Sequence, residues 1–344
     1  MVPIPLRLIL DGDALVANWR WLAHRGGGAG CGAAVKADGY GLGAREAVRR
    51  LAAAGCRDFF VATWAEAKAL MPWRSDLALS VLHGVGPDDL QAALASPARP
   101  VLNSPEQVAR WRETARPCDV MIDTGMNRLG IAPADARSGL LDGLQVETLM
   151  SHLASADEDA PSNEAQRAAF VGLAKGVRAR RLSLANSAGI CLGREYSFDL
   201  TRPGIALYGG VPRPEARGHV RRVVRVEARI VQRRRIEPGA RVGYNATFTA
   251  SQAHELAILN IGYADGYLRG FSGMGRARIG DGFGAVVGRV SMDLTAICVD
   301  AAPELKEGDW VELDYDLPAA SAQSGLTQYE LLTTLGSRFE RIWR

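Results

Sequence analysis

Short apolar runs alternate with amphipathic segments up to about residue 215. Each apolar run has the length of one strand, and the runs fall at residues 6–11, 31–36, 58–63, 77–82, 99–103, 119–123, 146–152, 181–186 and 204–209. Apolar residues recur with helical spacing between several of them, at residues 43–55, 64–71 and 162–181. Strands separated by helices are typical of parallel βα units. The pattern predicts an α/β domain of about eight or nine such units, as in a (β/α)8 TIM-like barrel, although periodicity alone leaves a doubly wound sheet open.

The rhythm changes after residue 215. Segments such as "VVRVEARIVQRRRI" and "AVVGRVSMDLTAICVD" are rich in β-formers and are separated by glycine and proline, with one late helical pattern in "LTQYELLTTLG". This is typical of a mostly-β domain. We therefore expect a barrel over residues 1–215, whose first strand could belong to the β-domain, and a β-rich domain over residues 216–344.

Polar residues follow three of the predicted barrel strands. Lys36 ends the run 31–36, His152 ends the run 146–152, and Asn186 ends the run 181–186. The carboxyl ends of parallel strands carry the active site of α/β domains. We expect these three side chains to face one site.

Composition removes several classes of function. The 344 residues are 47% hydrophobic and 23% charged, and the net charge of +3 comes from scattered basic and acidic residues, which does not favour nucleic-acid binding. No apolar run approaches the ~20 residues of a membrane span, and the N-terminus lacks the basic region and cleavage site of a secretory signal. These features predict a cytoplasmic protein.

The cysteines and histidines give no metal motif. The five cysteines contain no CxxC pair and mostly lie in apolar runs, and the five histidines show no HExxH pattern. We expect reduced, buried thiols and no metal site.

Lysine is rare enough in this chain to be informative. Of 41 lysines and arginines only four are lysines, and Lys36 alone ends an apolar run. Arginine can replace lysine as a charge but not as a nucleophile, because the guanidinium stays protonated. A partly desolvated lysine has a lowered pKa and can form a Schiff base, so Lys36 is a candidate nucleophile, the plainer alternative being a lysine at a barrel rim.

Two later segments have the features of a phosphate site. "ANSAG" places Ser187 at the head of a predicted helix, where backbone N–H groups favour an anion. "TRPGIALYGG" follows with Arg202 and the glycine turn at Gly204. A nucleophilic lysine together with a phosphate site suggests pyridoxal phosphate (PLP).

These motifs, in this order, resemble those of the alanine racemase family, and the resemblance runs nearly end to end. "AVKADGYG" is similar to the lysine motif of the family, "DTGMNRLGI" to its arginine segment, and "GYNATFTA" to the segment with its second base. The resemblance implies a PLP-dependent isomerase that interconverts L- and D-alanine, on a barrel followed by a β-domain. It also implies a role in D-alanine biosynthesis for the cell wall.

The resemblance assigns a role to each matching residue. The implied catalytic residues are Lys36, which would carry the cofactor as an imine, and Tyr244. The implied cofactor contacts, besides Lys36, are Tyr40, His152, Asn186, Ser187, Arg202, Gly204, Ile205 and Tyr329. The implied substrate contacts are Arg128, Tyr263, Met292 and Asp293. Taken singly, His152 reads equally as a core histidine and Met292 as core filling, so their order around Lys36 carries the assignment.

The implied reaction uses two bases on opposite faces of the substrate, Lys36 and Tyr244. A phenol acts as a base at neutral pH where positive charge lies nearby, and we expect His152 and Arg202 to supply it. In the family the tyrosine acts on the cofactor of the partner chain. The resemblance therefore implies a homodimer with shared active sites.

Three positions depart from the family pattern. Met121 stands where many relatives carry a lysine, Leu42 where histidine is frequent, and Phe248 where tyrosine is frequent. We expect Arg128 to be held by another acceptor or an anion, with altered turnover or substrate range.

Other functions stay open at this stage. A broad-specificity or serine racemase of the same fold differs only in pocket volume, which sequence does not give. A non-catalytic PLP-binding protein would have no need of Tyr244, Arg128, Met292 and Asp293. The glycine-rich stretch at residues 25–32 lacks the G-x-G-x-x-G order and precedes a strand, so a dinucleotide site is not favoured.

Overall fold

The computed structural model describes residues 3–344, so the first two residues of the predicted barrel domain lie outside it. The chain divides into two compact units, Leu15–Arg221 and a second unit of Met1–Ala14 with Arg222–Arg344. Helix α1 (Gly12–Arg25) continues from one unit into the other. No helix among residues 3–344 is long and apolar enough to cross a membrane.

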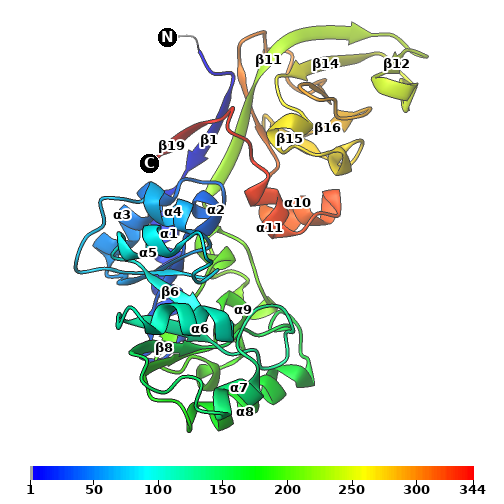
Figure 1. The fold of residues 1–344 in the computed structure, drawn as a ribbon. Coiled ribbons are helices and arrows are strands. Elements are labelled where there is room, and N and C mark those ends of the chain that lie inside the picture. Colours follow the sequence, from blue (N-terminus) through cyan, green and yellow to red (C-terminus); the bar gives the residue numbers. More distant parts are fainter. Residues whose placement is uncertain (1–2) are drawn as a thin grey trace. The chain divides into compact units, whose positions relative to one another are not determined.

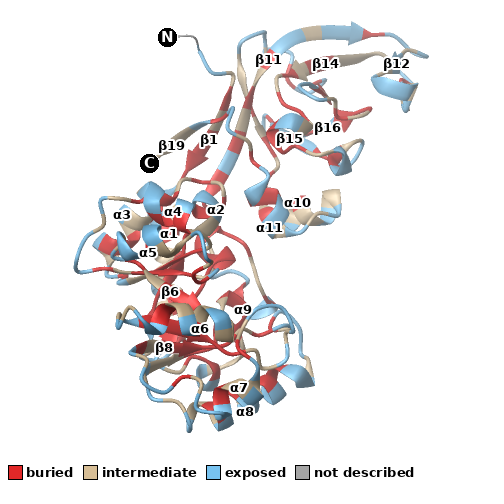
Figure 2. Ribbon diagram, viewed as in Figure 1, coloured by how far each residue is buried: buried red, intermediate tan, exposed pale blue. Residues whose placement is uncertain are grey.

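The first unit, blue to green in Figure 1, is built on a parallel sheet. Its neighbouring strands follow chain order: β3 (Ala33–Ala34), β4 (Asp58–Val61), β5 (Ala78–Val81), β6 (Arg99–Leu102), β7 (Cys118–Met121), β8 (Val146–Met150) and β9 (Ala179–Ser183). Burial covers nearly every position of β4 to β8, as Figure 2 shows in red for β6 and β8. Such continuous burial explains why these strands read as unbroken apolar runs.

A short strand closes this sheet into a barrel. β10 (Leu200–Thr201) pairs with β2 (Gly30–Cys31). Just after β10, the carbonyl of Pro203 accepts a hydrogen bond from the Ala34 N–H at 2.9 Å. On the other side, the Arg202 N–H donates to the carbonyl of Ala185 at 2.8 Å. Both edges of the sheet are thus hydrogen-bonded to one segment, and the predicted TIM-like barrel is confirmed.

The prediction of a strand at residues 204–209 is wrong. Ile205–Tyr208 form the 3-10 helix η2, and the strand of this region is β10. All four residues of η2 are buried, and a short run buried on every side has no periodicity that separates strand from helix.

The helices α2 to α9 of the barrel unit follow its strands, and three of them begin at a side-chain N-cap. They are α2 (Lys36–Tyr40), α3 (Ala44–Ala54), α4 (Trp64–Ala69), α5 (Leu90–Leu94), α6 (Pro105–Arg112), α7 (Pro133–Arg137), α8 (Pro161–Ala174) and α9 (Ser187–Leu192), with the 3-10 turns η1 (Arg194–Tyr196) and η3 (Pro214–Ala216). Thr63 accepts from the Glu66 N–H ahead of α4, and Asn186 accepts from the Gly189 N–H ahead of α9. A cap of this kind stabilises a helix by about 1 kcal/mol.

The second unit is an antiparallel β structure, as predicted. Its strands are β1 (Leu6–Leu10), β11 (Val224–Ile236), β14 (His254–Leu259), β15 (Arg276–Ile279), β16 (Gly282–Val287), β17 (Thr295–Cys298), β18 (Trp310–Leu313) and β19 (Glu340–Trp343). The long strand β11 pairs with β18 near its start and with β14 near its end, which closes six strands into a ring (Figure 1). The first apolar run, β1, pairs with β11 and β19 in this sheet and is not a barrel strand.

Short elements carry the remaining predicted site residues. The ribbon β12 (Arg241–Val242) and β13 (Phe248–Thr249) is joined by the turn η4 (Tyr244–Ala246). The turns η5 (Tyr263–Asp265) and η6 (Arg269–Phe271) follow β14, and helices α10 (Leu317–Ser324) and α11 (Gln328–Thr333) precede β19.

Candidate functional site

Lys36 stands at the carboxyl end of β3, at the start of a left-handed turn. Ala37, Asp38 and Tyr40 have positive φ angles of 52°, 51° and 56°. The turn is held by hydrogen bonds from the Gly39 N–H to the Val35 carbonyl and from the Gly41 N–H to the Ala37 carbonyl. Each left-handed L-residue costs about 1–2 kcal/mol. Strain of this kind clusters at functional sites, where the surroundings fix it.

The surroundings of Lys36 favour its neutral amine. Burial lowers the pKa of Lys36 below 10.5, the positive charge of Arg128 lowers it further, and Glu66 acts in the opposite direction. Glu66 also accepts from the backbone N–H groups of Ala37 and Ala62 at 2.8 and 2.6 Å, which ties the turn to α4. A neutral amine is the form that attacks a carbonyl.

Arg128 lies on a loop shaped by Asp123. The carboxylate of Asp123 accepts from the backbone N–H groups of Gly125, Met126 and Arg128 at 2.8 to 3.0 Å. Burial opposes ionisation, but these backbone donors outweigh it and lower the pKa of Asp123. The Arg128 side chain is exposed, and Met121, at the end of β7, is buried.

His152 and Arg202 face the same region, and the guanidinium carries the charge. Burial lowers the pKa of His152 to about 3, with Arg202, Arg128 and Lys36 as further causes, so the imidazole is neutral at neutral pH. Burial also lowers the pKa of Arg202 to about 10, which leaves it protonated. Our expectation that His152 supplies positive charge was therefore wrong, because burial, together with the neighbouring basic side chains, disfavours the protonated imidazole.

Arg202 is anchored inside the barrel. Its guanidinium donates to the Ser183 hydroxyl at the end of β9 and to the Ser151 carbonyl after β8. Asp119 on β7, which is fully buried, favours the protonated form of Arg202. A buried guanidinium held on several sides keeps both its charge and its orientation.

Ser187, Gly204 and Tyr40 meet in one small region. The Ser187 hydroxyl accepts from the backbone N–H groups of Gly204 at 2.9 Å and Ala206 at 3.3 Å. A β-carbon on Gly204 would lie 2.0 Å from the Tyr40 hydroxyl, so only glycine fits there. Tyr40 in turn stacks on Tyr208, with ring centroids 4.8 Å apart. Three of the predicted phosphate contacts thus lie at helix starts: Ser187 is the first residue of α9, and Gly204 and Ile205 lie at the start of η2.

The other predicted residues belong to the β unit. Tyr244 in η4 is 66% exposed, Met292 is 53% exposed and Tyr329 in α11 is 49% exposed. Tyr263 and Met292 are neighbours, because the N–H groups of Tyr263 and Ala264 donate to the carbonyls of Ser291 and Met292 at 3.0 Å.

The comparisons agree with one another over the whole chain. A family model for the alanine racemase N-terminal domain matches residues 10–212, and one for the alanine racemase C-terminal domain matches residues 223–343. An alanine racemase of Acidiphilium cryptum is 43% identical over 97% of this chain and 98% of its own length. One of Methylobacterium nodulans is 42% identical over 97% of this chain and 95% of its own.

The fold comparison gives the same answer. A crystal structure of alanine racemase from Bartonella henselae, with covalently bound pyridoxal phosphate, has a TM-score of 0.92 and 34% identity over 99% of this chain and 100% of its own. The chain belongs to the alanine racemase family. Family membership confirms the predicted family, fold and isomerase class.

Sequence reasoning missed residues that shape the racemase site without matching a motif. Glu66 ties down the Lys36 turn, and Arg338 binds Asp265 at 2.6 Å and Asp293 at 2.8 Å. Arg338 comes from the segment before β19, far along the chain from both carboxylates. Its signal is weak in sequence, because an arginine in a polar connection resembles any surface charge.

Proposed function

We propose that this chain interconverts L- and D-alanine with PLP as its cofactor. The observation that carries the proposal is the full-length match to alanine racemases, 43% identical over 97% of the chain. Lys36, with a lowered pKa at the end of a barrel strand, supports it independently. Both the enzyme class and a lysine suited to an aldehyde cofactor point to the same chemistry.

The barrel residues fit PLP. Lys36 offers an amine for its aldehyde, while Ser187, Asn186 at the head of α9, and the glycine at position 204 offer hydroxyl and backbone groups for its phosphate. Tyr40, Ile205 and Tyr329 would complete the phosphate contacts. When bound, PLP withdraws electrons from the Cα–H bond of an amino acid.

Arg202 would face the pyridine nitrogen. A protonated guanidinium only donates hydrogen bonds, so the nitrogen opposite it has to accept and stay unprotonated. This limits how much electron density the ring draws, which disfavours transamination. His152, neutral beside Arg202, adds packing and no further charge.

Lys36 and Tyr244 would exchange the Cα proton on opposite faces. Lys36 would take or return the proton on one face, and its lowered pKa increases the fraction of its amine that is neutral. Tyr244 of the partner subunit does so on the other face. Arg128, Tyr263, Met292 and Asp293 would hold the substrate.

The assembly follows from the place of Tyr244. Tyr244 is 66% exposed and Met292 is 53% exposed, so a second copy of the chain could contact both. We infer a homodimer in the cytoplasm, with either D-alanine supply for the cell wall or alanine catabolism as its role. The division of the molecule into a PLP-binding barrel domain over 1–215 and a β-domain over 216–344 belongs to the same proposal, with the first strand, β1, assigned to the β-domain.

A chiral assay tests the proposal. The wild type is expected to racemise L-alanine, and Tyr244→Phe is expected to lose racemisation while keeping the visible absorption of the bound cofactor. L-Serine, assayed in parallel, measures substrate breadth. A colourless wild-type protein that takes up no PLP would remove the proposal, and cofactor binding without turnover would favour a non-catalytic carrier.

A further inference from the structure

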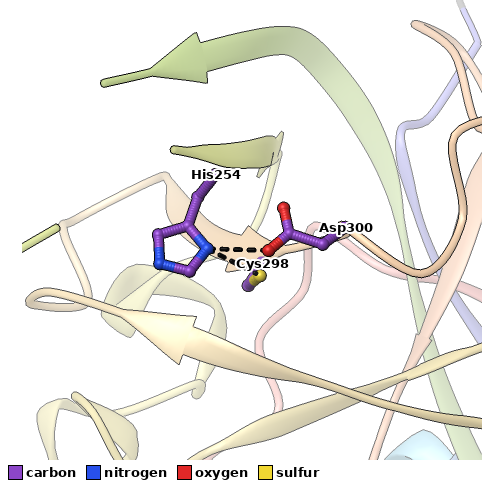
Figure 3. Close-up of side chains that lie close together, drawn as sticks. All are labelled: His254, Cys298 and Asp300. Atoms are coloured by element: carbon purple, nitrogen blue, oxygen red, sulfur yellow. Dashed lines mark hydrogen bonds and ion pairs between the residues drawn. The ribbon is translucent and has the colours of Figure 1, made fainter. Parts of the chain in front are cut away.

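Three potential metal ligands, none of them among the predicted site residues, meet in the β unit. His254 begins β14, Cys298 ends β17, and Asp300 follows it. The antiparallel register pairs Leu256 with Cys298, so His254 comes opposite Asp300. Their ligand atoms lie within 4.8 Å of one another (Figure 3), and no other such group of three occurs among residues 3–344.

The three side chains already point at each other. The Nδ1 atom of His254 lies 2.7 Å from Oδ2 of Asp300 and 3.8 Å from Sγ of Cys298. The other carboxylate oxygen of Asp300 accepts from the Glu255 N–H at 2.6 Å, which fixes the carboxylate. Figure 3 shows the imidazole, the thiol and the carboxylate converging, so little rearrangement separates them from a coordination site.

We propose that His254, Cys298 and Asp300 form a binding site for a transition-metal ion of the zinc type. Nitrogen, sulfur and carboxylate oxygen are the ligands that Zn²⁺ takes, whereas Mg²⁺ and Ca²⁺ prefer oxygen alone. Metal–ligand distances of about 2.3 Å to sulfur and 2.1 Å to nitrogen put these two atoms roughly 3.5 Å apart in a tetrahedron. The present 3.8 Å is close to that value, and the 2.7 Å hydrogen bond has to lengthen.

A fourth coordination position has room beside the three ligands. His254 and Cys298 both line a hollow of about 560 Å³, together with Thr247, Phe248 and residues of β16. A water molecule can occupy that position. Binding forms bonds from the metal to Nδ1, Sγ and Oδ2. The thiol proton passes to solvent, and any proton on Nδ1 of His254 leaves that nitrogen for Nε2 or for solvent.

The site lies against the ribbon that carries Tyr244. The ring centroids of Phe248, on β13, and His254 are 6.1 Å apart. Phe248 also pairs with Val242 in the two-stranded ribbon whose turn contains Tyr244. Cys298 packs against the same small core, beside Val287. We expect the metal to shift this ribbon and lower racemase turnover, a consequence that rests on the proposed role of Tyr244.

The test is metal binding to the PLP-loaded enzyme, freed of metal with a chelator. Equilibrium dialysis with Zn²⁺ is expected to give one ion per chain, and Co²⁺ a thiolate-to-metal band in the difference spectrum against the same enzyme without Co²⁺. His254→Gln, Cys298→Ala and Asp300→Asn should each weaken binding by about tenfold or more. The matched controls His24→Gln and Cys191→Ala should keep it.

Two results would overturn the site: no Zn²⁺ retained by the wild type, or binding that survives both His254→Gln and Cys298→Ala. Circular dichroism and the cofactor absorption of each variant establish that it is folded. Racemase turnover without metal is measured separately, so a failure of the proposed activity is distinct from a failure of the metal site. Zn²⁺ bound with unchanged turnover would overturn the coupling to Tyr244 alone.

Discussion

Gly204 leaves room for the Tyr40 hydroxyl, which lies 2.0 Å from where a β-carbon on Gly204 would stand. The same glycine donates its N–H to Ser187, so its backbone cannot retreat without breaking that hydrogen bond. Because glycine has only a hydrogen atom as its side chain, α2 and the start of η2 can approach one another this closely at Gly204.

Gly204→Ala is expected to weaken PLP binding by about tenfold to a hundredfold, since overpacking costs about 1–3 kcal/mol. The added methyl has to push Tyr40 aside. A spectroscopic titration of PLP into the apo-enzyme measures the loss. Gly172→Ala in α8, where no atom lies within 4 Å of the new β-carbon, is the matched control. In a Tyr40→Phe background, Gly204→Ala should weaken PLP binding by a smaller factor than it does in the wild type. An equal loss of PLP affinity in both backgrounds would count against the clash with the Tyr40 hydroxyl.

The charges around Lys36 predict a pH effect with a definite sign. Burial is the main cause that lowers the pKa of Lys36. Arg128 lowers this pKa further, and Glu66 raises it. A lower pKa gives more neutral amine at any pH below 10.5. The rate at which apo-enzyme takes up PLP should thus rise with pH, with its midpoint shifted up in Arg128→Gln and down in Glu66→Gln. Shifts of the same sign in both variants would contradict this account, and Glu46→Gln on α3 is the control.

Arg338 holds together the two segments that carry Tyr263 and Met292. It binds the buried carboxylate of Asp265 and the exposed one of Asp293. Arg338→Ala leaves Asp265 buried without its cation, and we expect KM for alanine to rise about tenfold and Tm to fall. Steady-state kinetics and thermal unfolding measure the two effects. Arg180→Ala, at an exposed pair with Glu147, should change neither.

Because Met121 stands where many relatives carry a lysine, we expect the kinetics of this chain to differ from those of such relatives. Its side chain is buried at the end of β7, below the loop that Asp123 shapes around Arg128. Met121→Lys is expected to change kcat/KM for alanine by about tenfold, because a buried amine perturbs the charges around Arg128. Met274→Lys, at a position 60% exposed, is the control. Unchanged kinetics in Met121→Lys would remove the idea that this position sets turnover.

The sequence was most informative where burial is continuous. Strands such as β7 are buried at every position, so each reads as one apolar run, and the polar residues after them mark the site. Residues 204–209 are apolar as well, but they form a 3-10 helix, which an apolar run alone does not reveal.

Contacts between distant residues could not be read in the same way. The pKa of His152, lowered to about 3, depends on burial and on Arg202, Arg128 and Lys36, which come from three other segments of the chain. His254 and Cys298 are 44 positions apart, so no spacing motif joins them, and only the register of β14 with β17 does. Motif spacing finds ligands within one element and misses those joined by a sheet.

The pairing of β1 with β19 has a consequence for biosynthesis. Arg7 lies opposite Glu340, so a strand that precedes the barrel in the chain pairs with one that follows it. Barrel strands β3 to β10 need no such partner, and nascent domains generally fold as they emerge. The barrel can therefore form before β19 has been synthesised, and loss of β19 would leave the β1 edge open to pairing with other molecules.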